Sequence, residues 1–241
     1  MPSVNENPVG LKQINVSMIS KDPPSNTMLT QVPLFSRLSD TEIQSVLSHA
    51  TKKTIAKNTI IITEGDRSVS LYVIMSGKVK VFLQDNEGKE VVLNSQEAGE
   101  YFGELALIDD EPRSASVMTL EKSTFLIISK EEFKQMLCNH PDIAFGLIQG
   151  LVLRLRCLTE NVKDLALTDV YGRVVKLLSG LAKTQAGKQV IEDCLTQQEI
   201  ANWVGASREM VGRILRDLTT GGYITVKGKC IFINDKLPLA W

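Results

Sequence analysis

Histidine and cysteine are scarce in this sequence of 241 residues. It contains two histidines and four cysteines, and no two cysteines form a CxxC pair, so their spacing predicts neither a zinc knuckle nor an iron–sulfur cluster. His49 and His140 both lie in helical contexts and are interpreted as structural. No Ser/His/Asp set and no phosphate-loop motif indicates catalysis. The sequence therefore predicts no metal site, no bound cofactor and no enzymatic activity.

Long apolar runs and a strong excess of one charge are also missing. The longest apolar stretch, IAFGLIQGLVL, is short and is interrupted by Gln149, so it is not expected to span a bilayer. No charged-then-apolar leader begins the sequence, and we expect a cytoplasmic protein without a membrane partner. The net charge is −1, but the residues from Asp169 onward carry ten lysines and arginines against seven acidic residues. A mildly basic C-terminal third is compatible with nucleic-acid binding.

The first part of the chain divides into a polar extension and a β-rich segment. Residues 1–28 are rich in Asn, Ser and Pro and are predicted to be a flexible extension. Ser39 and Glu42 form a capping box that opens a helix. Short β-like segments then follow without helices between them, and a DNEG turn joins two that alternate apolar and polar residues. This pattern predicts an antiparallel barrel or jelly roll within residues 29–140.

A heptad pattern follows over residues 141–167. Apolar residues recur at steps of three and four, at Ile148, Leu151, Leu155, Leu158, Val162 and Leu165. A stripe of two residues in seven is narrower than the buried face of a core helix. It therefore favours a dimerisation helix and a homodimer over the alternative, an ordinary helix packed on its own domain.

The stretch LTQQEIANWVGASREMVGRIL predicts a helix-turn-helix. Thr196 and Glu199 form a capping box, Gly205 permits a turn, and Ser207 can cap a second helix. The second helix has a buried stripe at helical spacing, made of Val211, Ile214, Leu215 and Leu218. The following GGYITVKGKCIFI is interpreted as a hairpin wing with a Lys-Gly-Lys tip. A winged helix-turn-helix is thus predicted over residues 168–241.

Four residues of the second helix are expected to face outward near its N-terminus. Arg208 and Arg213 can donate to guanine, and Glu209 can accept from cytosine. Gly212 leaves room for a close approach. The alternative is a surface helix with an intrahelical Glu209–Arg213 pair.

The stretch GELALIDDEPRSAS, residues 103–116, predicts a cup for a small anion. A guanidinium from Arg113, the Ser114 hydroxyl and backbone N–H groups suit a phosphodiester, whereas a carboxylate suits a sugar hydroxyl. Two alternatives remain open. Arg113 can merely neutralise Asp109 or Glu111 in a solvated turn, or the acids Asp109, Asp110 and Glu111 can bind a hard cation.

From Leu34 to Asn234 the sequence resembles the family of the cyclic AMP receptor protein and the fumarate–nitrate regulators. LTQQEIANWVGASREMVGRIL resembles the family's DNA-reading element, and LALTDVYGRVVKLL resembles its hinge region. The resemblance implies an α+β fold with an N-terminal jelly roll of the cyclic-nucleotide-binding type, a long dimerisation helix and a C-terminal winged helix-turn-helix. It also implies a homodimeric transcription regulator that binds double-stranded DNA and contacts RNA polymerase.

The resemblance assigns roles residue by residue. Glu104 matches the acid that binds the ribose hydroxyl, and Arg113 and Ser114 match the pair that binds the cyclic phosphate. The implied ligand-binding set is Gly103, Glu104, Leu105, Arg113, Ser114, Ala115, Leu158 and Thr159. Arg208, Glu209 and Arg213 match the three base-reading residues, which implies a palindrome with TGTGA-like half-sites. The implied DNA-binding set is Thr196, Gln197, Ser207, Arg208, Glu209, Gly212 and Arg213.

Two departures from the family leave the ligand open. Leu158 and Thr159 stand where the receptor protein places a threonine and a serine against the nucleotide base, and a leucine cannot hydrogen-bond a purine. The extension also carries no cysteine group for an oxygen-sensing cluster. The expected effector is cyclic AMP or a related cyclic nucleotide or dinucleotide, including cyclic di-GMP. A ligand-independent regulator and a cyclic-nucleotide-binding module without DNA function remain alternatives.

Overall fold

The computed structural model describes residues 29, 32–36, 38–185, 188–192, 195–228 and 230–238. The predicted extension over residues 1–28 and Lys229 of the wing tip lie outside the described residues. The described chain forms two compact units, one up to Leu155 and one from Arg156 onward. We call them the roll unit and the C-terminal unit.

The roll unit begins with a 3₁₀ turn, Pro33–Phe35, and helix α2, Asp40–His49. The predicted capping box at the start of α2 is confirmed: the backbone N–H of Ser39 donates to the carboxylate of Glu42 at 2.7 Å. The helix then buries Ile43 and Val46 against the roll. Capping and an apolar stripe together explain why this polar segment is helical.

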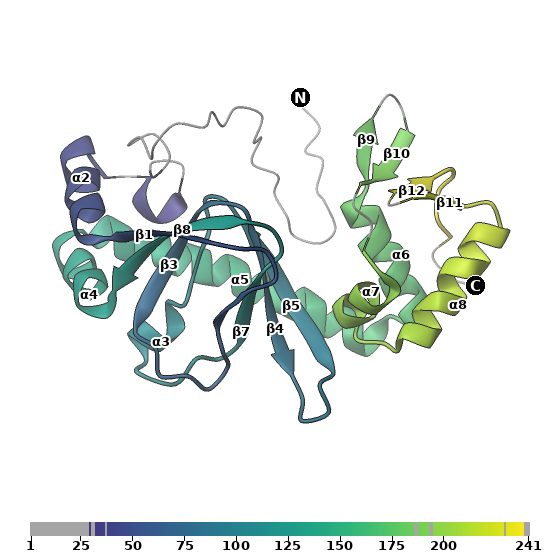
Figure 1. Ribbon diagram of the computed structural model, residues 1–241, viewed down its shortest axis with the longest axis horizontal. Helices are drawn as coiled ribbons and strands as arrows, with labels where there is room; N and C mark the ends of the chain where they lie inside the picture. Colours follow the sequence, from purple (N-terminus) through teal and green to yellow (C-terminus); the bar gives the residue numbers. More distant parts are fainter. Residues whose placement is uncertain are drawn as a thin grey trace. The chain divides into compact units, whose positions relative to one another are not determined.

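Two antiparallel sheets of four strands form the body of the roll unit (Figure 1). The first sheet has the order β1 (Thr51–Ile55), β8 (Ser123–Ser129), β3 (Ser70–Ser76) and β6 (Tyr101–Phe102). The second has the order β2 (Ile60–Ile62), β7 (Ser116–Thr119), β4 (Lys78–Gln84) and β5 (Glu90–Glu97). The predicted antiparallel jelly-roll architecture is confirmed, and the DNEG turn joins β4 to β5 as expected.

The expectation that no helix interrupts the strands is wrong. A single helical turn, α3 (Leu105–Ile108), follows β6 because Ala106 and Leu107 turn inward and are buried. The sequence pattern also gives no prediction of strands β1 and β6. β1 is an exposed edge strand of polar residues, and β6 has only two residues, so neither shows a readable period.

The two sheets enclose an apolar core. Phe102 stacks on Tyr72 with ring centroids 5.1 Å apart, and Phe125 meets Phe102 edge-on at 5.7 Å. The other members of this core are Ile62, Ile74, Val79 and Val117. A second cluster joins β3 and β8 to α2, to α4 (Lys130–Asn139) and to the start of α5 (Pro141–Leu167).

Helix α5 covers the 27 residues over which the sequence predicts one long helix. Five of the six predicted seam residues are exposed, namely Ile148, Leu155, Leu158, Val162 and Leu165. Leu151 instead packs partly against the core of its own unit. Further apolar side chains are exposed on the helix, namely Phe145, Val152, Leu153 and Leu167. The exposed apolar face is therefore wider than the predicted two-in-seven stripe.

The C-terminal unit packs three helices on a small sheet. The helices are α6 (Val170–Leu181), α7 (Gln197–Val204) and α8 (Arg208–Thr220). The sheet has the order β11 (Ile224–Lys227), β12 (Cys230–Ile233), β10 (Lys188–Ile191) and β9 (Lys183–Gln185). The hairpin β11–β12 is the predicted wing, and the hairpin β9–β10 was not predicted.

Candidate functional site

The Arg113 guanidinium is buried in the roll unit and is 3% exposed. Its Nε donates to the Ser68 hydroxyl at 2.8 Å, Nη1 to the Gly103 carbonyl at 2.5 Å, and Nη2 to the Ser70 carbonyl at 2.7 Å. All three acceptors are neutral, and no carboxylate of the described residues forms an ion pair with it. Burial lowers the pKa of Arg113, although a guanidinium stays protonated in proteins. Glu104 and Asp66 are close enough to favour the charged guanidinium, but neither forms an ion pair with it, so the site can accept an anion.

Unused donors surround this cation. A guanidinium has five N–H groups, and the three bonds described above leave two of them. The Ser114 hydroxyl is exposed and makes no hydrogen bond with the part of the chain that the structure describes. The backbone N–H groups of Ser114 and Ala115 also make no hydrogen bond within the described residues. Such a set of hydroxyl, amide and guanidinium donors matches the oxygens of a phosphodiester.

The acids of the neighbouring loop form no ion pair with Arg113, whose three acceptors are neutral, and two of these acids have other partners. Asp110 forms an ion pair with Lys130, and Lys134 approaches it at 3.8 Å. Asp109 accepts a hydrogen bond from the backbone of Glu111 at 3.1 Å. The interpretation that Arg113 merely neutralises these acids is therefore wrong. Within the described residues, no group of three or more His, Cys, Asp or Glu side chains is placed to hold a metal ion.

Gly103 is required by this arrangement. Its φ is +87°, a conformation that residues with a Cβ rarely adopt. A Cβ at this position would lie 2.5 Å from Nη1 of Arg113 and 2.9 Å from the Ser70 carbonyl oxygen. The glycine thus lets the guanidinium reach the backbone of two segments.

Glu104 is also buried, at 2% exposed. Its Oε1 accepts from Nη1 of Arg154 on α5 at 2.5 Å. Arg154 donates as well to the carbonyl of Tyr101 and lies over that residue's ring, 4.7 Å from the centroid. The other carboxylate oxygen has no hydrogen bond within the described chain and is available to a hydroxyl. Sequence reasoning missed Arg154, because nothing local marks a helix arginine as the partner of an acid 50 residues earlier.

The predicted ligand set is only partly assembled in one unit. Gly103, Glu104 and Arg113 lie together, whereas Leu105 is exposed on α3. Leu158 and Thr159 are exposed residues of α5 beyond the boundary between the units. Their relation to Arg113 stays a prediction.

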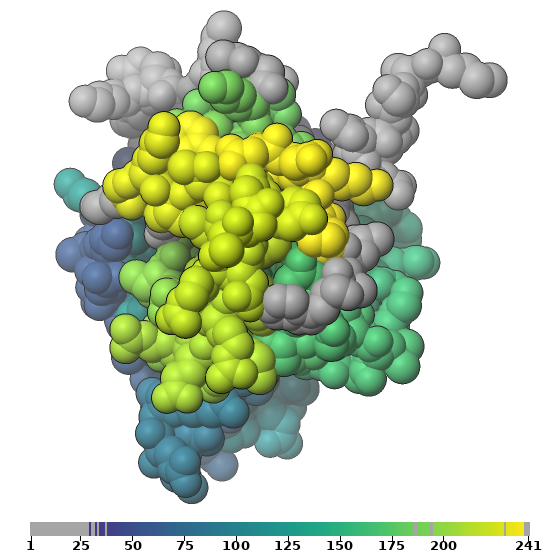
Figure 2. Space-filling view, turned by 90° about the vertical axis from the view of Figure 1, so that its right-hand side faces the viewer, coloured from purple at the N-terminus to yellow at the C-terminus, as the bar shows by residue number. Residues whose placement is uncertain are grey.

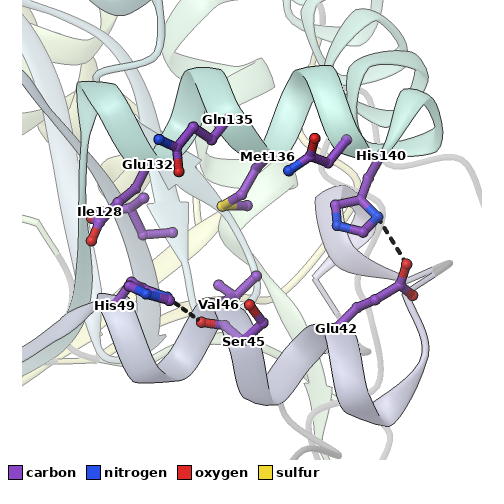
Figure 3. A pocket seen from close by; sticks show the side chains of 10 residues that line it. Glu42, Ser45, Val46, His49, Ile128, Glu132, Gln135, Met136 and His140 are labelled. Atoms are coloured by element: carbon purple, nitrogen blue, oxygen red, sulfur yellow. Dashed lines mark hydrogen bonds and ion pairs between the residues drawn. The ribbon is translucent and has the colours of Figure 1, made fainter.

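The two histidines lie beside a shallow pocket between α2 and α4 (Figure 3). Nδ1 of His140 lies 2.8 Å from the carboxylate of Glu42, and Nδ1 of His49 lies 2.8 Å from the carbonyl of Ser45. The His140 contact joins the end of α4 to α2, whereas the His49 contact lies within α2. The structural interpretation of both histidines stays a prediction.

The helix-turn-helix forms as predicted. Thr196 and Glu199 form the capping box of α7, Gly205 ends that helix with φ of +64°, and the Ser207 hydroxyl accepts from the backbone of Met210 at 3.2 Å. The stripe on α8 buries Val211, Ile214 and Leu218, while Leu215 is only half-buried.

The outer face of α8 is open to solvent (Figure 2). Arg208, Glu209 and Arg213 are exposed there, and their side chains make no hydrogen bond or ion pair within the described residues. The Glu209–Arg213 pair is thus not formed. At Gly212 a Cβ would lie 3.0 Å from the side-chain oxygen of Gln197, so the glycine also lets α7 and α8 pack closely.

A β-roll around a buried cation and a winged helix-turn-helix with a free outer face define a ligand-responsive DNA-binding regulator. Comparison with known protein families supports this class of protein. Residues 52–140 match the family described as Cyclic nucleotide-binding domain, and residues 172–240 match the Crp-like helix-turn-helix domain. No helix of the described residues is long and apolar enough to cross a membrane.

Known proteins resemble most of the chain. It is 37% identical over 184 residues to a CRP-like cAMP-activated global transcriptional regulator of Mycobacterium tuberculosis, covering 75% of this chain and 82% of that protein. It is 34% identical over 198 residues to the cAMP-activated global transcriptional regulator CRP of Salmonella typhimurium, covering 80% of this chain and 94% of that protein. The structure of a c-di-GMP-responsive global regulator of Xanthomonas campestris matches with a TM-score of 0.74 and 28% identity, covering 81% and 99%.

The chain belongs to the CRP family of transcription regulators. It combines a cyclic nucleotide-binding domain with a DNA-binding helix-turn-helix, and it is a regulator rather than an enzyme.

Proposed function

We propose that this protein is a homodimeric regulator whose roll binds cyclic AMP and whose paired α8 helices read a palindrome with TGTGA-like half-sites. The observation that carries the proposal is the Arg113 guanidinium, which is buried, forms no ion pair with a carboxylate of the described residues and keeps two N–H donors. The division into an extension over 1–28, a roll over 29–140, a dimerisation helix over 141–167 and a DNA-binding domain over 168–241 is part of the proposal.

Cyclic AMP is supported by the relatives named as cAMP-activated at 34–37% identity. The second candidate is cyclic di-GMP. It is favoured by Leu158, which cannot hydrogen-bond a base, and by the c-di-GMP-responsive regulator among the similar structures. In both cases Arg113 and Ser114 bind phosphate and Glu104 binds a ribose hydroxyl.

The dimer is supported by the exposed apolar face of α5. Leu155, Val162 and Leu165 are each more than half exposed, and covering such side chains provides the favourable free energy of association. Two-fold symmetry would place the two half-sites about one helical turn of DNA apart. Contact with RNA polymerase and a cytoplasmic location are expected from the resemblance to the family.

The switch requires a ligand that binds one arrangement of the dimer more tightly than the other. We propose that α5 and the hinge near Asp169–Gly172 carry the change to α8. Because Leu158 adds an apolar contact to the seam, we expect partial DNA binding without effector. If the affinity for DNA stayed the same over a full titration with every candidate nucleotide, the proposed ligand switch would be wrong.

Calorimetry tests the ligand. Wild-type protein is titrated with cyclic AMP, cyclic GMP and cyclic di-GMP, and one of them is expected to bind. Arg113→Leu should weaken that binding about 100-fold or more, because it removes two charge-assisted hydrogen bonds. Arg67→Leu removes an exposed arginine nearby and serves as the matched control. If the nucleotide bound wild type and Arg113→Leu with equal affinity, the proposed anion-binding site at Arg113 would be wrong.

Light scattering tests the dimer. Leu155→Glu places a charge on the exposed apolar face of α5 and should yield monomers that no longer bind the palindrome. Lys163→Glu changes charge at an exposed position of the same helix and should remain dimeric. A dimeric Leu155→Glu variant would contradict the proposed interface.

A further inference from the structure

Two amide side chains of β5 have buried oxygens that lack a hydrogen-bond donor. They are Oδ1 of Asn94 and Oε1 of Gln96. Gln96 is 2% exposed. Within the described residues neither side chain makes any hydrogen bond. Burying an amide without a partner destabilises the fold, so these two atoms call for a donor from outside the described residues, such as a ligand.

Strand pairing places both amides on the inner face of the roll. Asn94 lies opposite Val81, which lies opposite Val117 on the next strand. Gln96 lies opposite Val79. Directly opposite residues in antiparallel strands share a face, and Val79 and Val117 belong to the core between the sheets. The amides therefore extend that core's wall with polar groups.

The same wall leads to the proposed phosphate site. β7 begins at Ser116, three residues after Arg113, and Val117 stands in one row with Val81 and Asn94 across three neighbouring strands. Two strand spacings separate the ends of this row, about 10 Å. The wall that carries the amides is thus within reach of the other end of a ligand whose phosphate binds Arg113.

We infer that Asn94 and Gln96 accept hydrogen bonds from the exocyclic amino group of the ligand's base and so select amino-bearing cyclic nucleotides. The inference rests on the proposed function. An amino group supplies two N–H donors, which matches two acceptors without donors. An alkyl side chain such as Leu158 cannot supply this recognition, whereas the amides of β5 can.

The test uses pairs of cyclic nucleotides that differ by a single amino group. Cyclic AMP is compared with cyclic purine riboside monophosphate, and cyclic GMP with cyclic IMP, by calorimetry of the full chain. Wild-type protein should bind the amino-bearing member of at least one pair about tenfold or more tightly, the worth of one buried hydrogen bond. Gln96→Leu and Asn94→Leu should reduce that preference, with little change for the partner that lacks the amino group.

Ser95→Ala is the matched control. Ser95 is buried on the same strand but lies opposite Lys80, on the other face of the sheet, so its loss should leave the preference unchanged. Gln96→Met keeps the length of the side chain and replaces Gln96→Leu if the latter is unstable. Thermal unfolding without ligand should show that Gln96→Leu is at least as stable as wild type, because it removes an unpaired amide.

The outcomes separate this inference from the proposed function. If wild-type protein binds both members of each pair equally, the amides do not select the base, and only this inference falls. A preference that survives both leucine variants overturns it as well, because the base is then recognised elsewhere. If no cyclic nucleotide binds wild-type protein, both the proposed function and this inference are wrong.

Discussion

The arginines of the two units are used in opposite ways. Arg113 in the roll is 3% exposed and is held by three neutral acceptors. Arg208 and Arg213 on α8 are exposed, and their side chains make no hydrogen bond or ion pair within the described part of the chain. One cation is fixed in the interior before any ligand arrives, whereas the others are left in water.

Under the proposed function, this difference matches the size of the two partners. A small anion gains most from donors that are already oriented in a dry site, where charges interact strongly. DNA instead presents a large charged surface to which exposed side chains adapt. Substitutions in the roll site should therefore change folding as well as binding, and substitutions on α8 should change binding alone.

The largest expected effect is at Gly103. Gly103→Ala adds a Cβ where φ is +87° and where Arg113 lies 2.5 Å away. Gly65→Ala adds one at a similar φ of +83° with no atom within 4 Å, so it isolates the backbone strain of about 1 kcal/mol. Urea unfolding should show that Gly103→Ala is less stable than Gly65→Ala by about 2 kcal/mol. Equal losses would mean that Arg113 moves freely and is not fixed.

The outer face of α8 should behave in the opposite way. Arg208→Ala is expected to weaken binding to the palindrome by about 1–3 kcal/mol, measured by fluorescence anisotropy at fixed salt, because one base contact is lost. Its free energy of unfolding should stay within about 0.5 kcal/mol of wild type. Arg216→Ala removes the same charge farther along α8 and is the control. A large loss of stability in Arg208→Ala would remove the contrast between the units.

Tyr101 provides a smaller test inside the roll unit. Its hydroxyl is buried next to Gly150 of α5 and has no hydrogen-bond partner among the residues that the structure describes. Tyr101→Phe keeps the ring under Arg154 and should raise the free energy of unfolding by up to about 1 kcal/mol. Tyr72→Phe, at a half-buried ring on the core, is the control. A destabilised Tyr101→Phe would show that the hydroxyl has a partner in solution.

The same residue predicts a dependence on pH. Burial raises the pKa of Tyr101 to about 12 from an ordinary value of 10.0. Because the folded state holds this proton more tightly than the unfolded state, the stabilisation is complete below pH 10 and is lost as the pH rises toward 12. Wild-type protein should therefore lose stability relative to Tyr101→Phe over that interval in parallel unfolding titrations.

The smallest effect is expected at the loop beside Arg113. The side chain of Asp110 is 61% exposed in its ion pair with Lys130, and exposed ion pairs contribute less than about 1 kcal/mol. Asp110→Asn keeps a residue that tolerates the positive φ found there. For Asp110→Asn, neither the free energy of unfolding nor the free energy of nucleotide binding should change by more than this amount. A large loss of binding would make the loop acids part of the site.

The fold was predictable where local signals agree. The capping boxes at Ser39 and Thr196, the glycine at 205 and the stripe on α8 each form as expected. Strand β1 and the hairpin β9–β10 were not predicted, because their side chains are mostly exposed and show no alternation of apolar and polar residues. Leu151 was assigned to the seam by its spacing, yet it also reaches the core, because two faces of α5 are apolar.

The site was predictable only in its local part. Gly103, Glu104 and Arg113 lie within one short motif, so sequence reasoning found them. Arg154 and the carbonyl of Ser70 join them through long-range contacts that leave no local pattern. Asn94 and Gln96 were missed for a further reason. A regular hairpin would place Leu93 opposite Val81 and Ser95 opposite Val79, but the irregular register between Val81 and Phe82 brings Asn94 and Gln96 to those positions instead.

That β-bulge also gives β5 an unusual tolerance for changes in length. In a regular strand the loss of one residue turns every following side chain to the other face. Here Leu93 is already the surplus residue, since Val92 lies opposite Phe82 and Asn94 opposite Val81. Deleting it would restore a continuous ladder with both amides still facing inward. We therefore expect that this chain can lose Leu93 without a rearrangement of the wall of the roll.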